Sequence, residues 1–183
     1  MTLVESKIRE SSLAFDKLVW PVMIDKLGGG SYVPVETRAT LEGVKELDML
    51  AGIDAWQIMP DNKGMRGIAQ RAQKNINFKT FTIRYSTGYG CKYTEYQKRY
   101  DAINSTDGLL YPHYTIQAYY TTTCDNTPDK LLSVAAIKTS DLIAYVDNHK
   151  DSISKLTNKQ DGSIFIVVKW NDLLRDDIEL LTA

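Results

Sequence analysis

The stretch GIDAWQIMPDNKGMRGIAQRAQ, residues 52–73, decides the fold expected for this chain. Leu50 to Met59 is a short apolar run that carries one acid, Asp54, and we expect it to form a strand. Pro60 to Gly64 has the composition of a turn. Met65 to Gln73 is then expected to return as a second strand, so the whole stretch predicts a β-hairpin.

Further elements are expected on both sides of this hairpin. Before it, residues 5–27 predict a helix that Gly28–Gly30 ends, with Pro21 as a kink or the start of a second helix. Ser31–Glu36 predicts an edge strand or an extended entry. After it, strands are expected at 78–86, 111–121, 131–138 and 163–170, the last buried on both faces, and helices at Thr94, where Gln97 completes a capping box, and at Thr139 or Ser140. This order predicts an α/β fold with a mixed central β-sheet flanked by helices. We expect a single domain, residues 1–183, with a core at 30–104 and C-terminal strands and helices at 110–180.

Length and composition exclude several classes of protein. The chain has 183 residues, of which 43% are hydrophobic and 25% charged, as is ordinary for a globular protein. No apolar run approaches the roughly 20 residues that cross a bilayer, and no basic leader precedes an apolar stretch. The two cysteines, Cys91 and Cys124, have no CxxC spacing and are expected as reduced thiols. A cytoplasmic location without membrane contact is the expectation.

The distribution of charge is more informative than the net charge of −1. Residues 62–99 contain a single acid, Glu95, but nine cations: Lys63, Arg66, Arg71, Lys74, Lys79, Arg84, Lys92, Lys98 and Arg99. Such asymmetry can focus a positive field on one surface. Alternatively, these cations lie on a solvated face and pair with acids from other segments.

Asp54 is the first candidate for chemistry. An acid between apolar neighbours in a strand costs free energy unless it is paired or binds a cation. Metal-dependent phosphodiester cleavage needs carboxylates that hold a hard cation such as Mg²⁺, and a group that stabilises charge on phosphate. The second strand brings Gln70 and Arg71, and Asp48 shares the face of Asp54 if the chain is extended there.

The pattern GID, turn, IAQRAQ, with a helix before it and the polar helix TEYQKR after it, resembles the PD-(D/E)XK nuclease superfamily. In that family an Asp on one strand is followed, across a hairpin, by an acid-x-Lys pair on the next strand. The resemblance covers roughly residues 30–104. It implies a restriction-endonuclease-like core, Mg²⁺ or Mn²⁺ as cofactor, and Asp54 as the first metal ligand. Asp48, on the same face, is our candidate for a second metal ligand.

The acid-x-Lys pair is incomplete in this sequence. In one register Gln70 stands in place of the acid and Ala72 in place of the lysine. In the other register Ala69 and Arg71 take these two places, and the sequence leaves both registers open. Candidates for the missing carboxylate are Asp48, Glu36 and the first helix, at Glu10 or Asp16.

Aromatic residues alternate with cations after the third expected strand. Cations on phosphates and rings against bases are the usual means of holding a nucleic-acid strand. The helical spacing of Tyr96 and Tyr100 suits core packing instead. The expected nucleic-acid contacts are therefore Arg84, Tyr89, Lys92, Tyr93, Lys98 and Arg99.

Two functions follow from these patterns. The first is a nuclease, for which DNA is favoured over RNA as the substrate. In it Asp54 ligates the metal, Gln70 assists Asp54 in holding the metal, and Arg71 stabilises charge on the phosphate. The second is the same fold without catalysis, which binds nucleic acid or inhibits a protein. The sequence also leaves open that two copies of the chain form a homodimer.

Overall fold

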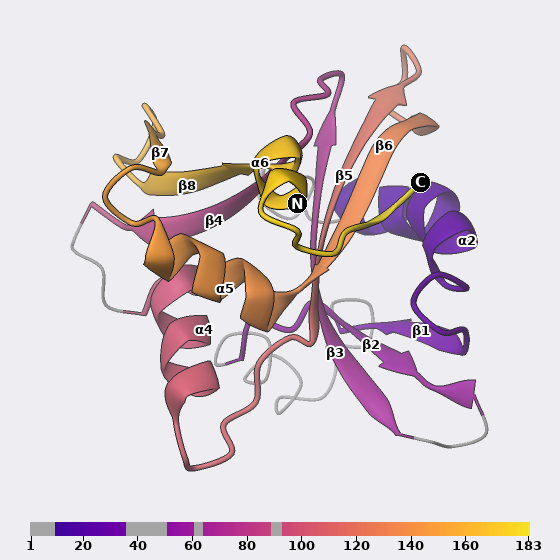
Figure 1. Cartoon of the computed structure of the whole chain (residues 1–183). Helices are drawn as coiled ribbons and strands as arrows, with labels where there is room; N and C mark the ends of the chain where they lie inside the picture. Colours follow the sequence, from indigo (N-terminus) through magenta and orange to yellow (C-terminus); the bar gives the residue numbers. More distant parts are fainter. Residues whose placement is uncertain (1–9, 36–50, 61–63, 89–92) are drawn as a thin grey trace.

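The computed structural model describes residues 10–35, 51–60, 64–88 and 93–183. It is a mixed α/β structure with two sheets (Figure 1). The larger sheet has the strand order β1-β2-β3-β5-β6-β9, and the smaller sheet has the order β4-β8-β7. The strands are β1 Ser31–Pro34, β2 Ala55–Ile58, β3 Met65–Lys74, β4 Thr80–Ser86, β5 Tyr114–Thr122, β6 Pro128–Lys138, β7 Ser154–Thr157, β8 Ile164–Lys169 and β9 Leu181–Thr182. The helices are η1 Phe15–Val19, α2 Trp20–Met23, α4 Glu95–Asn104, α5 Thr139–Asn148 and α6 Trp170–Arg175.

The expected hairpin is confirmed as the antiparallel pair β2–β3, in which Ala55 lies opposite Ile68 and Ile58 opposite Met65. Of the two forms expected at Ser31–Glu36, the edge strand is found, because within the described residues β1 lies at one end of the larger sheet, beside β2. The first strand of the hairpin is shorter than expected, since it begins at Ala55. Asp54 therefore lies just before the strand and not in its middle.

The larger sheet is mixed because β3 and β5 run parallel, with Arg71 opposite Gln117. The chain between these two strands contains β4 and α4, which is the long crossover that a parallel pair requires. Its first part departs from the expectation of one central sheet, since β4 leaves β3 and joins the smaller sheet beside β8.

The N-terminal helical segment covers one face of the larger sheet (Figure 1). A π-helical turn, η1, ends at Val19, and α2 begins at Trp20 with Pro21 in its first turn, as expected for a second helix at that proline. The apolar side chains of this segment pack on Ile68 and Ile116. Gly30, which has a φ of 95°, follows the segment, and a Cβ there would meet the carbonyl oxygen of Ile58. Only glycine fits that close approach.

The opposite face of the sheet is covered by α4, α5, α6 and the smaller sheet (Figure 1). Their shared core includes Phe81, Tyr119, Leu142, Ile166 and Trp170. The expectation that the strand near residues 163–170 is buried on both faces is wrong. In β8 only alternate residues, Ile166 and Val168, are buried, because the strand lies in a three-stranded sheet with one face partly open.

The helix expected at Thr94 is confirmed with its cap, because the Thr94 hydroxyl accepts a hydrogen bond from the backbone N–H of Gln97 at 3.3 Å. Tyr96 is buried in the core, and Tyr100 packs against it, as their helical spacing indicates. Among the described residues, no helix is long and apolar enough to cross a membrane.

Candidate functional site

A polar recess of about 210 Å³ opens where β3, β4, α4, β5 and the segment before β2 meet. Five elements distant in sequence converge there, and they bring charged and amide side chains into one small volume. We call this the recess, and its principal polar side chains are Asp54, Arg71, Glu95, Arg99, Thr115 and Gln117.

The alternation of β3 decides which of its side chains contribute. Arg71 points to the side of α4 and β4, where its neighbour across the parallel pair is Gln117. Gln70 points to the other side, and its carboxamide oxygen accepts a hydrogen bond from the Tyr32 hydroxyl at 3.1 Å. The side chain of Arg71 therefore faces α4 and β4, and that of Gln70 faces Tyr32. Because the carboxamide of Gln70 accepts the hydrogen bond from Tyr32, the polar group that Gln70 offers to the recess is its backbone N–H, which bonds Asp54.

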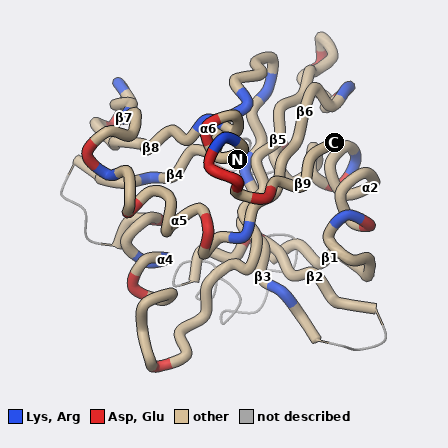
Figure 2. The backbone as a smooth tube through the Cα atoms, viewed as in Figure 1, with Lys and Arg blue, Asp and Glu red and all other residues tan. Residues whose placement is uncertain are grey.

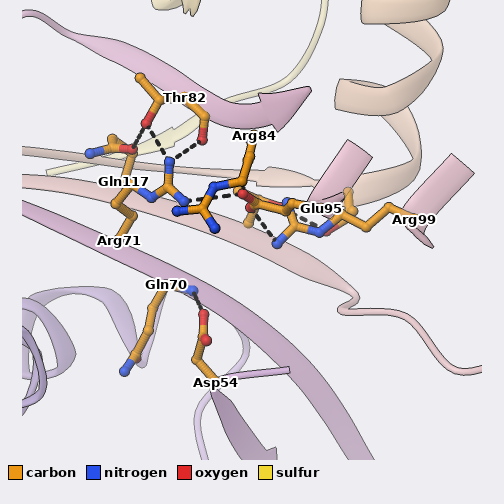
Figure 3. A network of polar contacts seen from close by, with 10 residues as sticks. Asp54, Gln70, Arg71, Thr82, Arg84, Glu95, Arg99 and Gln117 are labelled. Atoms are coloured by element: carbon orange, nitrogen blue, oxygen red, sulfur yellow. Dashed lines mark hydrogen bonds and ion pairs between the residues drawn. The ribbon is translucent and has the colours of Figure 1, made fainter. Parts of the chain in front are cut away.

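Asp54 is held against β3 by its side chain and its backbone. One carboxylate oxygen, Oδ2, accepts a hydrogen bond from the backbone N–H of Gln70 at 2.6 Å, as Figure 3 shows. The backbone N–H of Asp54 donates to the carbonyl of Ile68 at 2.9 Å. The acid expected from the sequence is therefore positioned at the recess, with a direct tie to the strand that carries Arg71.

Glu95 is the centre of the charged network (Figure 3). Its Oε2 lies 3.1 Å from Nη2 of Arg71 and accepts a bond of 3.1 Å from the backbone N–H of Arg84. Its Oε1 lies 2.8 Å from Nη2 of Arg99. Burial acts to raise the pKa of Glu95, but the charges of Arg99 and Arg71 outweigh it, so this pKa lies below its ordinary value. The carboxylate is therefore ionised at neutral pH.

Arg71 is fixed on its other side by β4 (Figure 3). Its Nη1 donates to the backbone carbonyl and the hydroxyl of Thr82, both at 3.0 Å. The Thr82 hydroxyl in turn donates to Oε1 of Gln117 at 3.3 Å. The guanidinium is thus held in one position at the wall of the recess.

Arg99 is buried, with 3% of its side chain exposed. Only its Nη2 is paired with Glu95, while Nε and Nη1 have no hydrogen-bond partner within the described part of the structure. Nε2 of Gln117, another wall residue, is also without a partner there. Buried donors are nearly always satisfied, and an unsatisfied one costs about 1–3 kcal/mol. Gln117 and Arg99 lie at opposite ends of the network, with Arg71 and Glu95 between them (Figure 3).

The residues expected to contact nucleic acid lie in different places. Arg84 is exposed on β4, and its guanidinium carbon lies 5.3 Å from the centre of the Phe165 ring. Tyr93 is 71% exposed, and Lys98 is half-buried on α4. Arg99 corrects the expectation of a surface cation, because it lies inside the recess. Three expected site residues fall outside the described residues: Asp48, Tyr89 and Lys92.

The carboxylates proposed from sequence to complete the site do not gather at Asp54. Glu10 instead pairs with Lys74, its Oε1 lying 2.9 Å from the ammonium nitrogen. Asp16 is in η1, on the helix-covered face. Glu36, like Asp48, falls outside the described residues. No cluster of three or more His, Cys, Asp or Glu side chains able to hold a metal ion occurs in the described ranges.

The sequence patterns did not identify Glu95 as a site residue, although two features of the sequence distinguish it. It is the one acid among the nine cations of residues 62–99, and it stands in the first turn of a capped helix, four residues before Arg99. Glu and Arg at that spacing face each other on a helix. Its contact with Arg71 depends on the packing of α4 against β4, which no local pattern indicates.

Comparisons with models of protein families, with curated proteins and with solved structures find no match to this chain.

Proposed function

We propose that the chain binds nucleic acid, and that a phosphate group of the nucleic acid enters the recess. The observation that carries this proposal is the presence of Arg71 and Arg99 in one small recess, where Arg99 has two unpaired buried N–H groups. Arginine presents its donors in a planar fork that matches phosphate oxygens, and it stays charged at any physiological pH.

The arrangement of elements supports a restriction-endonuclease-like core as the scaffold. A helical segment is followed by β1, the β2–β3 hairpin, β4 and α4, and then by β5, which runs parallel to β3. Asp54 at the base of the hairpin and Arg71 on β3 both line the recess. In the proposed scaffold, Asp54 stands for the first acid of the PD-(D/E)XK pattern and Arg71 for the lysine. DNA is the form of nucleic acid that this resemblance favours.

A second candidate function is phosphodiester cleavage with Mg²⁺ or Mn²⁺ at the same recess. It is favoured by the two carboxylates, Asp54 and Glu95, that line the recess. Magnesium is commonly held by one or two carboxylates together with substrate phosphates and water. Such an ion would supply a polarised phosphate and an activated water molecule.

The donor set fits such an ion only in part. Both oxygens of Glu95 already receive N–H groups or cations, so an ion would have to compete with Arg71 and Arg99 for this carboxylate. Asp54 also accepts a backbone hydrogen bond, and Arg71 is a poor general base because it does not release its proton. The residues of the recess therefore support phosphate binding better than phosphodiester cleavage.

One pair of assays separates the two functions. Labelled DNA and RNA are titrated in EDTA, and the same strands are then incubated with Mg²⁺ or Mn²⁺ and resolved on a denaturing gel. We expect binding of the parent in EDTA; its absence for every strand would refute the binding proposal. If the recess also cleaves, Asp54→Asn abolishes cleavage and keeps both the fold and the affinity. Cleavage by this variant at the parental rate would remove Asp54 from the active site.

A further inference from the structure

A second group of cations lies on the other side of the larger sheet, past the end of the helical segment. Lys26, in the turn after α2, and Lys138, the last residue of β6, line one small pocket together with Tyr114 of β5. Arg66 of β3 joins them, because its guanidinium carbon lies 6.0 Å from the centre of the Tyr114 ring. The strand register brings them together, since Tyr114 lies opposite Lys138 in β6 and opposite Ile68 in β3. We call Lys26, Arg66 and Lys138 the cation cluster.

Arg66 is held in place while most of its donors stay available. Its Nη1 donates to the backbone carbonyl of Leu27 at 3.2 Å, and its guanidinium lies over the Tyr114 ring. This is the one hydrogen bond that its side chain makes within the described residues. Since an arginine side chain has five N–H donors, the others can bind solvent or a ligand.

The cation cluster has few acids beside it. Its three members make no ion pair with any described residue, and Glu179 is the one acid among the described residues that line the pocket. The recess differs in this respect, because its two arginines share the carboxylate of Glu95. Like charges that are held close together repel one another, and a bound anion offsets that repulsion.

His113 lies close enough to the cation cluster to respond to its charge. Its backbone N–H donates to the carbonyl of Gly67 at 2.6 Å, and the centre of its ring lies 5.7 Å from that of Tyr114. Partial desolvation of the ring lowers the pKa of His113, and the positive charges of Arg66 and Lys138 lower it further. The imidazole is therefore mainly neutral at pH 7, and an anion bound to the cluster would raise this pKa.

A phosphate group suits the size and the charge of this pocket. Its volume of about 130 Å³ is well below the roughly 300–1,000 Å³ of sites that hold a complete small molecule, so the pocket accepts one small group. Three cations against Glu179 leave a net charge of +2. A phosphate monoester carries a charge of about −1.5 to −2 at neutral pH, and guanidinium and ammonium groups are the usual partners of its oxygens.

We infer that Lys26, Arg66 and Lys138 bind a phosphate group at this pocket, which is a site separate from the recess. The sheet lies between the two sites, since Arg66 faces the helical segment and Arg71 faces α4 and β4. The inference does not rest on the proposed function. The phosphate belongs either to a small phosphate compound or to the backbone of a nucleic acid, and the test distinguishes these two sources.

The test is an NMR titration of the parent protein, whose two histidines, His113 and His149, give separate imidazole signals. Inorganic phosphate is added at about pH 6.5, the ordinary histidine pKa, while sodium chloride keeps the ionic strength constant. The signals of His113 should shift and saturate, because the bound anion makes the ring easier to protonate. The signals of His149, which lies beside Asp176, should stay in place. An unchanged His113, or a shift that grows linearly without saturation, would overturn the inference.

A second titration identifies the source of the phosphate. It uses a single-stranded oligonucleotide with hydroxyl groups at both ends. Saturation of the His113 shift at an oligonucleotide concentration equal to or below that of inorganic phosphate would assign the site to a nucleic-acid backbone. Saturation at higher concentrations, or none, would assign it to a small phosphate compound. If the oligonucleotide binds but neither ligand shifts His113, the inference falls while the proposed function stands.

Variants with a matched control locate the contacts. Lys138 is exposed and makes no hydrogen bond within the described residues, so Lys138→Gln should keep the fold. It should weaken phosphate binding at least about tenfold, since one hydrogen bond to a charged group accounts for that ratio. Lys150→Gln, at a lysine 61% exposed beside Asp147, should leave the binding unchanged.

Arg66 and Arg71 separate the two faces of the sheet in the same titration. Arg66→Gln should weaken phosphate binding more than Arg66→Lys, which keeps the charge. Arg71→Ala changes the recess and should leave the response of His113 to phosphate as in the parent. Phosphate binding that survives both Lys138→Gln and Arg66→Gln, or that is lost in Arg71→Ala, would overturn the inference.

Discussion

The two faces of β3 are built from alternate residues of one short sequence, yet they have opposite characters. On one face Ile68 packs with Ile116 and the helical segment in a core without charged members. On the other face Arg71 stands in a network with Glu95 and Arg99. The apolar face gains its stability from burial, whereas the charged face keeps donors that the described residues do not satisfy. This difference fits the proposal that the first face stabilises the fold and the second binds a ligand.

The largest expected effect on stability comes from a substitution of Glu95, in the charged face of β3. At pH 7, Glu95→Gln should lower the free energy of unfolding by about 3–5 kcal/mol, because it leaves the buried Arg99 without its counter-ion. The measurement is denaturant unfolding of parent and variant at several pH values.

The pH dependence of this difference has a defined sign. Since the pKa of Glu95 is lowered in the folded state, its contribution is complete above the ordinary glutamate pKa of about 4.3 and is lost as the pH falls through the folded value. Parent and variant should therefore converge in acid. A difference that stays constant from pH 7 to pH 3 would show that the charge of Glu95 is not what stabilises the network.

The next largest expected effect on stability comes from a substitution in the apolar face of β3. Ile68 is fully buried, so Ile68→Ala should cost about 2–5 kcal/mol of stability through lost burial and a residual cavity. Affinity of the folded variant for nucleic acid should equal that of the parent, as measured by anisotropy at a temperature where both are folded. If the fully folded Ile68→Ala variant lost much of its affinity for nucleic acid, the two faces of β3 would not have separate functions.

A third prediction sharpens the role of the charged face. Arg71→Ala should weaken nucleic-acid binding by about 1.5–3 kcal/mol, the range for hydrogen bonds to a charged group. Arg71→Lys should weaken it less, because lysine keeps the charge but loses the planar fork. Equal affinities of the two variants, compared in the same titration, would place Arg71 outside the contact.

The smallest effect concerns Gln70, which adjoins Arg71 in sequence but faces the helix. Burial raises the pKa of Tyr32 to about 12, so its hydroxyl remains a donor to Gln70 at neutral pH. Gln70→Ala should therefore cost about 0.5–1.5 kcal/mol of stability and leave the affinity unchanged. If Gln70→Ala lost as much affinity as Arg71→Ala, the Gln70 carboxamide would have to contact the nucleic acid, against this prediction.

Local patterns were sufficient for much of the fold. The hairpin, the capped helix at Thr94 and the edge strand before Pro34 depend on turn composition, capping and the missing N–H of proline, all of which act over a few residues. The position of β4 could not be predicted in this way, because the choice between two sheets is decided by its packing with β8. The alternating pattern of β4 is the same in either sheet.

The candidate site was predicted only in part for the same reason. Asp54 and Arg71 were found because they belong to one hairpin. Arg99 was found as a cation but expected at the surface, since nothing local indicates that α4 buries it beside Glu95. The acidic residues at the other end of the chain gather around α6 and the segment after it, away from the recess (Figure 2). Whether a cation is exposed or enclosed is thus decided by tertiary packing.

The most direct test of the central claim is the salt dependence of nucleic-acid binding. The affinity of the parent should fall linearly on a log–log plot against salt, and each phosphate contact removed should reduce the slope by about 0.7–0.9. The double change Arg71→Ala and Arg84→Ala should therefore reduce it by roughly 1.4–1.8. The matched pair Lys150→Ala and Arg175→Ala, at side chains 61% and 71% exposed beside the acidic residues Asp147 and Asp172, should leave it unchanged. A parent that shows no salt-dependent binding to DNA or RNA, or equal slopes for the two double variants, would contradict the account.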